Sequence, residues 1–339
     1  MIPNVLVAGG AGFVGSALVR VLLADGVRVV ILDDFSSGSR ENLEEIRNRV
    51  EIVACDAAEP AALSSAMMRV RPTHVVSCIG DTYVPAVYEY PERFFRNNVT
   101  ANLNVLRACG GLGISKLLYL SSAEVYGHQP DVLLDECTAL GATNTYAVSK
   151  LAADQLMLTY GGEHGVPTLV ARLFNCYGPR ETHAYIVPEI IDQLHRGSEL
   201  VIGNIHAIRD FTYVEDTARA LRDLLFAETP PCTAVNVGSG SAVSIADLAR
   251  IIGRLMGHET VASTTDIAKL RRNEITAIRC DNSRLRELTG WSPSVSLEDG
   301  LRRTIAWFRG NNGRWPWRSH DEETGAHGKV ERLPQALAG

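Results

Sequence analysis

The chain has 339 residues, of which 46% are hydrophobic and 21% are charged. This composition is that of an ordinary soluble protein of about two domains, with enough apolar material for a large core. The formal net charge of −6 argues against nonspecific nucleic-acid binding and against attraction to anionic lipid surfaces.

Four absences narrow the class of protein further. The sequence has no apolar run of the roughly 18 residues that a membrane-spanning helix needs, and its N-terminus lacks the pattern of a signal peptide. Its seven cysteines are scattered without a CxxC pair, and its histidines form no HxH or HxxxH pair. We therefore expect a cytoplasmic protein with reduced thiols, no membrane association and no bound metal.

Short apolar runs alternate with amphipathic segments along the first two thirds of the chain. The expected strands are Asn4–Ala8, Arg28–Asp33, Glu51–Ala54, His74–Cys78, Leu117–Leu120, Thr168–Ala171 and Ala234–Val237. The expected helices between the early strands are Ser16–Ala24, Pro60–Val70, Phe94–Cys109 and Tyr146–Tyr160. Continuously apolar strands that alternate with helices predict a parallel sheet covered on both faces. The fold class is therefore α/β, with a doubly wound parallel (Rossmann) sheet.

The pattern becomes less regular after residue 174. Further helices are expected at Val187–Arg196, Ile245–Met256, Leu285–Leu288 and Leu297–Arg309. We expect a Rossmann domain over residues 1–173, to which residues 207–240 return, and a smaller lobe that binds substrate over residues 174–310. Residues 311–339 have mixed charge and little periodicity, which predicts a flexible tail in which Trp315 and Trp317 can dock locally.

Glycines follow the first expected strand at the point where a helix begins. Gly9, Gly12 and Gly15 form the pattern GxxGxxG, which turns the chain, admits a pyrophosphate to backbone N–H groups and packs the helix on the strand. Asp33 ends the second strand, where an acid binds the ribose 2′-hydroxyl of NAD and repels the 2′-phosphate of NADP. The pattern therefore predicts NAD, and a glycine turn needed only for packing is the alternative. Asp56 after the third strand can reach the adenine or cap the next helix.

A tyrosine and a lysine lie four residues apart on the expected helix Tyr146–Tyr160 and so share one face. The ammonium of Lys150 favours the phenolate of Tyr146 and lowers its pKa, so that Tyr146 can remove a proton from an alcohol near neutral pH. Ser122, just after an expected strand, is the natural partner for the same oxygen. A YxxxK pair alone is common by chance, but its order after the glycine loop and Ser122 indicates a site that oxidises an alcohol.

These residues resemble the extended short-chain dehydrogenases/reductases, and within them the NAD-dependent epimerase/dehydratase family that acts on nucleotide sugars. The resemblance covers about residues 3–309 and rests on VAGGAGFVGS (7–16), LDDFSSGSRENL (32–43), NNVTANLNVLRAC (97–109), LSSAEVYG (120–127), YAVSK (146–150), RLFNCYGPR (172–180), RDFTYVEDTARA (209–220) and the Leu270–Cys280 stretch with RRNEI. It implies a catalytic triad of Ser122, Tyr146 and Lys150. It also implies a tightly held NAD that is reduced and reoxidised within one turnover.

The resemblance further implies two sets of binding residues. NAD is expected to contact Gly9, Gly12, Phe13, Val14, Asp33, Asp34, Ser37, Gly38, Asp56, Ala57, Ile79, Asn98, Tyr146 and Lys150. A nucleotide-diphosphate sugar is expected to contact Asp81, Thr82, Ser122, Ala123, Asn175, Val187, Arg209 and Arg271. Asn175 and the two arginines would hold the diphosphate, since a guanidinium fork fits phosphate oxygens. Alternatively, Arg209 pairs with Asp210, and Arg271 lies on a solvated surface.

Members of this family share the oxidation of a sugar hydroxyl to a ketone and differ in the later steps. A 4-epimerase needs room for the keto-sugar to turn over, whereas the 4,6-dehydratase branch carries an Asp-Glu pair after the catalytic hydroxyl. Here Ala123 and Glu124 follow Ser122, which favours C4 epimerisation. Glu124 can instead be the C5 base of a 4,6- or 5,6-dehydratase, or a structural carboxylate. A decarboxylase ranks third, because decarboxylases of this family usually differ around the Tyr/Lys helix. An NAD(H)-sensing protein ranks last, because Tyr146 and Lys150 are both kept.

The resemblance also implies a homodimer, in which the helices Phe94–Cys109 and Tyr146–Tyr160 pair with their copies as a four-helix bundle. Leu103, Leu106, Leu151 and Leu158 are its expected apolar contacts, although each can equally face its own sheet. Two departures from the family remain. The loop 203–209 has lost the Gly and Gln that often precede the arginine, which leaves the nucleobase open, and Asn144-Thr145 precede Tyr146 for no reason visible in the sequence.

Overall fold

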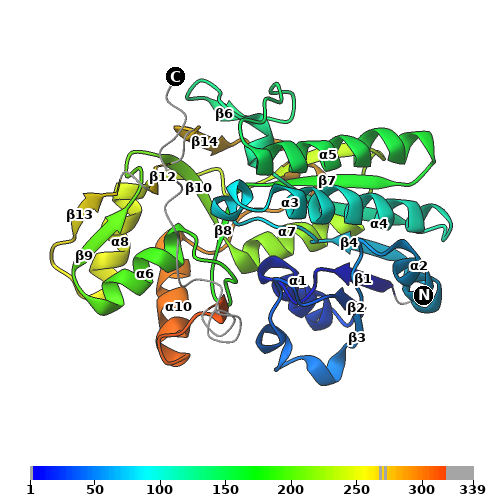
Figure 1. Cartoon of the computed structure of the whole chain (residues 1–339), viewed down its shortest axis with the longest axis horizontal. Helices are drawn as coiled ribbons and strands as arrows, with labels where there is room; N and C mark the ends of the chain where they lie inside the picture. Colours follow the sequence, from blue (N-terminus) through cyan, green and yellow to red (C-terminus); the bar gives the residue numbers. More distant parts are fainter. Residues whose placement is uncertain (1–2, 267–268, 271–272, 318–339) are drawn as a thin grey trace.

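The computed structural model describes residues 3–266, 269–270 and 273–317 (Figure 1). Its main sheet has seven strands, all parallel, in the order β11-β7-β5-β4-β1-β2-β3. They are β1 (Asn4–Ala8), β2 (Arg28–Asp33), β3 (Glu51–Ala54), β4 (His74–Ser77), β5 (Lys116–Ser122), β7 (Thr168–Leu173) and β11 (Thr233–Val237). The expected α/β fold with a doubly wound parallel sheet is confirmed.

Helices cover both faces of the main sheet (Figure 1). One face carries α1 (Phe13–Ala24), α7 (Val214–Phe226) and α9 (Ser283–Thr289), and the other carries α2 (Pro60–Val70), α4 (Ala101–Gly110) and α5 (Thr145–Glu163). Alternate residues of β1 enter the two cores, with Val5 and Val7 on one side and Leu6 and Ala8 on the other. Successive side chains point to opposite faces, and both faces are covered by helices. Both sets of side chains are therefore apolar, and the strand appears in the sequence as a continuous apolar run.

The helix expected over Phe94–Cys109 is not continuous. It is divided into α3 (Pro91–Phe95), a π-helical turn at Arg96–Thr100, and α4. The side-chain amide of Asn102 donates to the carbonyls of Asn97 and Asn98, at 3.3 and 3.0 Å, and so satisfies acceptors in the widened turn. The extra residue in this turn changes which side chains face the sheet, and Leu106 is fully buried in the protein's own core. Of the two alternatives that the sequence left open for Leu106, the structure shows the contact with its own sheet and not one with a second subunit.

The remaining strands build a second, smaller region. A five-stranded sheet has the order β12-β10-β14-β6, with β8 paired to β10, and a two-stranded sheet joins β13 to β9. The strands are β6 (Leu133–Leu134), β8 (Asn175–Tyr177), β9 (Glu199–Ile202), β10 (Ile208–Tyr213), β12 (Ala242–Ser244), β13 (Ala262–Thr265) and β14 (Ala277–Cys280). The helices are α6 (Ile186–Arg196), α8 (Ile245–Met256) and α10 (Leu297–Gly310). Ser244 and Ser296 cap the last two helices, each by accepting an N–H three residues later.

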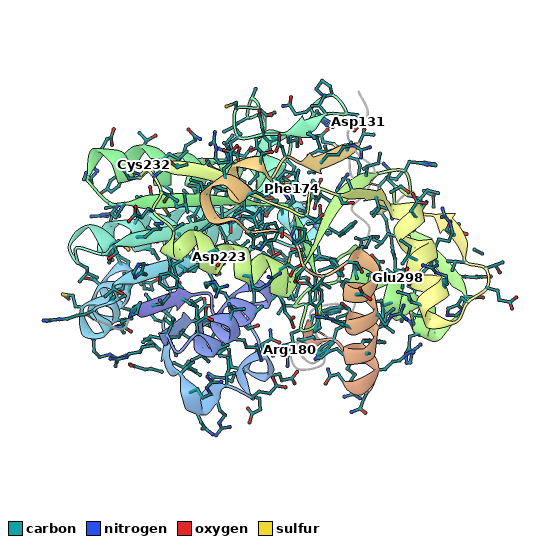
Figure 2. All side chains as sticks on the ribbon, turned by 180° about the vertical axis from the view of Figure 1, so that it is seen from behind. Asp131, Phe174, Arg180, Asp223, Cys232 and Glu298 are labelled. Carbon is teal, nitrogen blue, oxygen red and sulfur yellow. The ribbon has the colours of Figure 1, made fainter. Side chains whose placement is uncertain are left out.

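Chain segments cross between the two regions. The segment 207–240 contributes β10 to the smaller sheet, and only α7 and β11 join the main one, while β6 leaves the first 173 residues to pair with β14. We retain the division into a Rossmann domain and a substrate-binding lobe as a proposal, with these exchanges. Figure 2 shows Arg180 near the middle of the molecule, where it donates to Glu45 of the Rossmann part at 2.7 Å.

The beginning of the expected tail is part of the smaller lobe. Trp315 is fully buried and packs on Trp307 and Phe308, so aromatic burial fixes residues 311–317 against α10. The rest of the expected tail, residues 318–339, lies outside the described residues. Within the described part of the chain, no helix is both long enough and apolar enough to cross a membrane.

Candidate active site

The glycine-rich turn after β1 lies where the order of the main sheet reverses, between β1 and β4. Gly9 has a φ of +78°, and a Cβ there would lie 2.9 Å from the carbonyl of Cys78 after β4. A Cβ on Gly15 would lie 2.2 Å from the carbonyl oxygen of Gly9. No side chain fits at either position, so these glycines bring the loop, β4 and α1 into close contact. Ligands of open α/β sheets bind in the crevice at this point.

The start of α1 fits an anion. Gly12 is its extended N-cap residue and supplies no side chain to the first-turn N–H groups, among them those of Phe13 and Val14. A Cβ on Gly12 would meet only the carbonyl oxygen of Gly9, at 3.4 Å, so the space above the turn is open. Free donors at the positive end of a helix beside an open turn suit a pyrophosphate.

Asp33 connects the ends of β1 and β2. Its carboxylate accepts the N–H groups of Ala11 and Phe35, both at 2.8 Å. Burial raises the pKa of Asp33, and these two backbone hydrogen bonds oppose that shift. Asp33 therefore shapes the loop itself, whereas Asp34 is exposed and bonds to Ser36. A Cβ on Gly38 would lie 2.9 Å from the Asp33 carboxylate, so this turn also closes on the acid.

The other expected NAD contacts are three loop residues and two polar residues that hydrogen-bond to other parts of the protein. Ser37, Ala57 and Ile79 lie in the loops that follow β2, β3 and β4. Asp56 does not cap α2, whose N-cap residue is Glu59; it accepts the N–H of Ala58 at 2.8 Å and pairs with Arg96. Asn98 is fully buried, and its amide donates to the backbone of Asp81 and to Ser149. Asn98 thus ties the π-helical turn to α5.

The three expected catalytic residues lie on β5 and on the helix that packs against it. Ser122 ends β5, and its Oγ accepts the N–H of Glu124 at 3.2 Å, which leaves its own proton free to donate. Tyr146 lies in the first turn of α5 with its ring edge against the buried Phe94, at a centroid distance of 6.4 Å. The side chain of Lys150 reaches back to β5 and donates to the carbonyl of Leu120.

Lys150 is a buried cation in a largely apolar setting. Only 3% of it is exposed, and its ammonium lies 4.6 Å from the centre of the Tyr119 ring. Burial lowers the pKa of Lys150 from its ordinary 10.5 to about 8, against the opposing charges of Asp154 and Cys78. A lysine with a pKa of about 8 is still mostly protonated at neutral pH, so the site holds a buried positive charge.

Two residues next to this group were not predicted as functional from the sequence. Asn144 is the N-cap of α5: its Oδ1 accepts the N–H of Ala147 at 2.8 Å, and its Nδ2 donates to Glu124 at 2.8 Å. These two bonds explain why Asn144 precedes Thr145. Its amide caps the N-terminus of α5 and also holds the Glu124 carboxylate in place. Tyr185 donates to Thr82 at 2.6 Å. Burial, followed by the charges of Tyr146, Glu181 and Glu124, raises its pKa, so Tyr185 lies close to these groups.

The expected substrate contacts do not form one surface. Thr82 is half-buried beside Tyr185, whereas Asp81 is 4% exposed and its carboxylate holds Arg93 and Asn97. The side chain of Val187 is buried in the core of the smaller lobe and cannot contact a ligand. Ala123 is 4% exposed.

The residues expected to hold the diphosphate differ in their exposure to solvent. Asn175 on β8 is exposed, as a contact residue requires. Arg209 is buried, and its guanidinium pairs with Glu274 at 3.0 Å. The Asp210 carboxylate instead accepts the N–H groups of Ser239 and Gly240. Arg271 lies outside the described residues.

A family model described as GDP-mannose 4,6 dehydratase matches residues 6–304 of the chain. The protein belongs to the NAD-dependent epimerase/dehydratase family of extended short-chain dehydrogenases/reductases. UDP-glucuronic acid decarboxylase 3 of Arabidopsis thaliana is 30% identical over 318 residues, which are 88% of this chain and 87% of that protein. UDP-glucose 4-epimerase of Azospirillum brasilense is 29% identical and covers 91% of this chain and 92% of its own.

Solved structures of the same family superpose along nearly their whole length. The UDP-glucose 4-epimerase of Thermus thermophilus in complex with NAD has a TM-score of 0.82 at 29% identity, covering 91% of this chain and 99% of that one. DesIV, a dTDP-glucose 4,6-dehydratase of Streptomyces venezuelae with NAD and TYD bound, has a TM-score of 0.85 at 26% identity, covering 92% and 98%. Relatives of similar identity thus carry out different reactions.

The lowered pKa of Lys150 makes a prediction about stability. Between the pKa of the folded state, about 8, and the ordinary lysine value near 10.4 in the unfolded chain, the unfolded state binds more protons, so the wild type gains stability as pH rises. The NAD-free Lys150→Met variant should have a higher free energy of unfolding than the wild type at pH 7, by up to about 3 kcal/mol. Its advantage should shrink between pH 8 and pH 10. Urea unfolding at pH 7, 8.5 and 10 measures this, and a constant or growing advantage contradicts the assignment.

Proposed function

We propose that this protein is a nucleotide-sugar epimerase that inverts C4 through a transient 4-keto sugar. The support for the oxidation step is that Ser122 ends β5, while Tyr146 and the buried Lys150 lie on α5, the helix that packs against β5. The observation that favours epimerisation is Ala123, a buried residue without a proton donor at the position where the dehydratase branch has its acid.

NAD is the cofactor of this family, and it supplies the group that takes a hydride from the sugar carbon and returns it. The chain provides the rest of the site. We propose that the α1 N-terminus binds the pyrophosphate, that the acids after β2 bind the adenosine ribose, and that Ser122 donates a hydrogen bond to the C4 oxygen. The phenolate of Tyr146 then removes the hydroxyl proton and later returns it, while the charge of Lys150 keeps that phenol acidic.

A dehydratase is the second candidate, and Glu124 is the observation that favours it. Its Oε2 accepts a hydrogen bond from Asn144, which fixes the direction of the carboxyl group. A carboxylate two residues after Ser122 can serve as the base that removes the C5 proton in a 4,6- or 5,6-dehydratase. A decarboxylase remains third, supported by the identity to the plant enzyme. A protein that only senses NAD(H) is disfavoured by the presence of Tyr146 and Lys150.

Removal of the Tyr146 hydroxyl tests the oxidation step. Tyr146→Phe should lower turnover of the nucleotide sugar by roughly 10²- to 10⁴-fold, the usual contribution of a positioned acid or base. The ring and its contact with Phe94 stay, so the melting temperature and the bound NAD should not change. Tyr119→Phe is the matched control, because it removes a buried phenol next to Lys150 that has no hydrogen-bond partner among the described residues. Turnover by Tyr146→Phe equal to that of the control would refute the assignment.

Solvent exchange separates the two leading reactions. The protein is incubated in heavy water with UDP-, GDP-, dTDP- and CDP-sugars, and the products are resolved by chromatography and mass spectrometry. A C4 epimerase should give a product of unchanged mass with no deuterium at C5, because no C5 proton leaves. Glu124→Gln should then retain most of its activity. A product lighter by one water, with deuterium at C5 and loss of activity in Glu124→Gln, would replace the epimerase assignment by the dehydratase.

The homodimer is proposed on the exposed apolar side chains of the two helices. Phe95 at the end of α3 and Val148 on α5 are 40% and 43% exposed, and Leu103, Leu151 and Leu158 are half-buried nearby. Sedimentation should give twice the chain mass, and the double variant Phe95→Glu, Val148→Glu should give the monomer, because burial of charge disfavours the bundle. Met68→Glu on α2, at a residue 57% exposed, is the control that should stay dimeric. A wild-type monomer contradicts the bundle.

A further inference from the structure

A groove of about 340 Å³ runs between α1 and α10, on the face of the main sheet that carries α1 and α7. One face of α1 forms a wall of the groove, with lining residues that recur every three or four positions from Phe13 to Ala24. The rest of the lining comes from the turn after β8, the start of α7 and the segment that leads into α10. Tyr146 and Lys150 lie on α5, which packs on the opposite face of the sheet, so the groove is separate from the candidate catalytic residues.

The lining of the groove is rich in cations. Four arginines come from four different segments, namely Arg20 on α1, Arg180 in the turn after β8, Arg219 on α7 and Arg303 on α10. Glu215 and Asp216 also line the groove, and Glu45 pairs with two of the arginines. Four guanidinium groups thus face three carboxylates, so the groove keeps an excess of positive charge.

Two of these arginines share one carboxylate. Arg180 lies 2.7 Å from an oxygen of Glu45, and Arg20 lies 3.5 Å from the same oxygen. The side chain of Glu45 is 67% exposed, so water weakens both ion pairs. Burial lowers the pKa of Arg20, and the nearby charge of Arg180 lowers it further. An anion between the two guanidinium groups would relieve their repulsion.

Arg303 and Arg180 lie close to one phenol. Burial, followed by the charge of Glu215, raises the pKa of Tyr213 to about 12, and the charges of Arg303 and Arg180 both oppose that rise. The side chain of Arg303 is 55% exposed and lies 3.7 Å from Glu215, which is longer than a hydrogen bond. A single anion beside Tyr213 can therefore meet both guanidinium groups.

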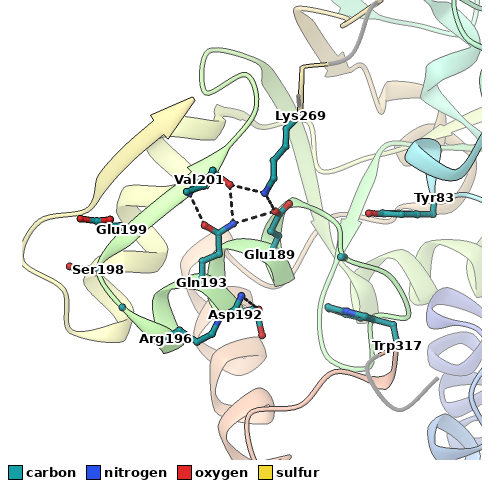
Figure 3. A pocket seen from close by; sticks show the side chains of 12 residues that line it. Tyr83, Glu189, Asp192, Gln193, Arg196, Ser198, Glu199, Val201, Lys269 and Trp317 are labelled. Carbon is teal, nitrogen blue, oxygen red and sulfur yellow. Dashed lines mark hydrogen bonds and ion pairs between the residues drawn. The ribbon is translucent and has the colours of Figure 1, made fainter. Parts of the chain in front are cut away.

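The larger cavity of the smaller lobe differs from the groove in how its charges are paired. It has a volume of about 730 Å³, and Figure 3 shows the side chains that line it. Lys269 pairs there with Glu189, and Arg196 pairs with Asp192, so each cation has a carboxylate of its own. In the groove, two arginines share Glu45. The groove, and not this cavity, therefore offers guanidinium groups to an added anion.

The backbone of Arg180 has a rare conformation. Its φ is +68°, a value that residues other than glycine seldom adopt. The side-chain amide of the buried Asn42 donates to the carbonyl of Arg180 at 3.4 Å and to that of Ala11, in the glycine-rich turn, at 3.1 Å. Residues held in such conformations cluster at active sites and ligand clamps. The turn that carries Arg180 is therefore fixed in the way that a binding residue requires.

We propose that the groove binds a phosphoryl group, with Arg20, Arg180 and Arg303 as its contacts. A guanidinium presents parallel N–H groups that match two phosphate oxygens, and the ligand adds the negative charge that the lining lacks. A volume of about 340 Å³ is near the lower end for small-molecule sites, so the occupant is inorganic phosphate or a small phosphate ester. The inference does not depend on the proposed function, because no proposed catalytic residue lines the groove.

Calorimetric titration of the NAD-loaded protein with inorganic phosphate and with glucose 1-phosphate tests this site. Both should bind at low ionic strength, where the attraction between charges is least screened. Arg303→Gln and Arg180→Gln should each weaken the binding of phosphate by about tenfold or more, because a charge-assisted hydrogen bond is lost. Tighter binding of glucose 1-phosphate that is lost in Arg303→Gln identifies an ester as the occupant, and equal binding of the two identifies the free anion.

Removal of the competing carboxylate tests the site in the opposite direction. Glu45→Gln should bind phosphate several-fold more tightly, because Arg20 and Arg180 then have no shared acid. Arginines with a purely structural role would lower the melting temperature of this variant without any gain in affinity.

Arg302→Gln is the matched control for Arg303→Gln. It removes the same charge from the neighbouring residue of α10, but Arg302 pairs with Glu298 at 3.1 Å and does not line the groove. Both arginine side chains are more than half exposed, so both variants should fold. Arg302→Gln should bind phosphate as the wild type does. Phosphate should also raise the melting temperature of the wild type and of Arg302→Gln more than that of Arg303→Gln, because a ligand stabilises the folded state that binds it.

Three results would overturn the inference. Undetectable binding of phosphate to the wild type contradicts it directly. Equal phosphate affinity in Arg303→Gln and the wild type would place the anion elsewhere. Equal weakening in Arg302→Gln and Arg303→Gln would show a general effect of charge and no defined site.

Discussion

Lys150, a cation only 3% exposed, determines how α5 must lie against the main sheet. Removing an ammonium from water costs several kcal/mol unless hydrogen bonds and an opposite charge replace the solvent. The carbonyl of Leu120 supplies one hydrogen bond, and Asp154, one helical turn further along α5, supplies the nearby charge. The hydrogen bond to Leu120 is lost when α5 shifts along β5, whereas Asp154 moves with Lys150 on the same helix. The site that tunes the tyrosine therefore also fixes the register of its helix.

Asp154 connects α5 to the rest of the molecule through further hydrogen bonds. Its two oxygens accept Nε and Nη2 of Arg172 on β7, at 3.0 and 3.1 Å, in a pair that is almost completely buried. Arg172 also donates to Tyr126, and Tyr126 donates to Asn236 on β11 at 2.7 Å. Asn236 then donates to the carbonyl of Leu134 on β6, in the second sheet. A continuous chain of hydrogen bonds thus runs from Asp154 on α5 through the main sheet to Leu134 in the second sheet, and it connects the two lobes.

The sequence predicted those features that are local in the chain. Apolar runs such as Asn4–Ala8 are strands in the structure, because residues buried on both faces leave a continuous signal. Gly9 and the Tyr146–Lys150 pair were singled out because each belongs to a short motif in the sequence. Asn144 was not explained, because the partner of its amide, Glu124, is 20 residues away.

Helix geometry explains why two positions were not settled by the sequence. The π-helical turn before α4 breaks the 3.6-residue period, so the sequence left open whether Leu106 faces its own sheet or a second subunit. Val187 lies in the first turn of α6, and a single apolar residue there does not reveal whether it faces a ligand or the core. In the structure its side chain belongs to the core. A 3.6-residue period in the sequence is enough to predict a helix. It predicts where a single side chain points only when the helix is regular.

Under the proposed function, the residues expected to separate epimerisation from dehydration lie next to this frame without being part of the buried charge network. Ala123 is buried beside Val125 and Tyr126. A carboxyl group in such a setting would have a raised pKa and remain protonated at neutral pH, which is the state needed to give a proton to a leaving hydroxyl. A methyl group in the same place offers no proton and costs nothing in desolvation. Because Lys150, Asp154 and Arg172 hold α5 independently of residue 123, the reaction can change at this position while the oxidising site stays intact.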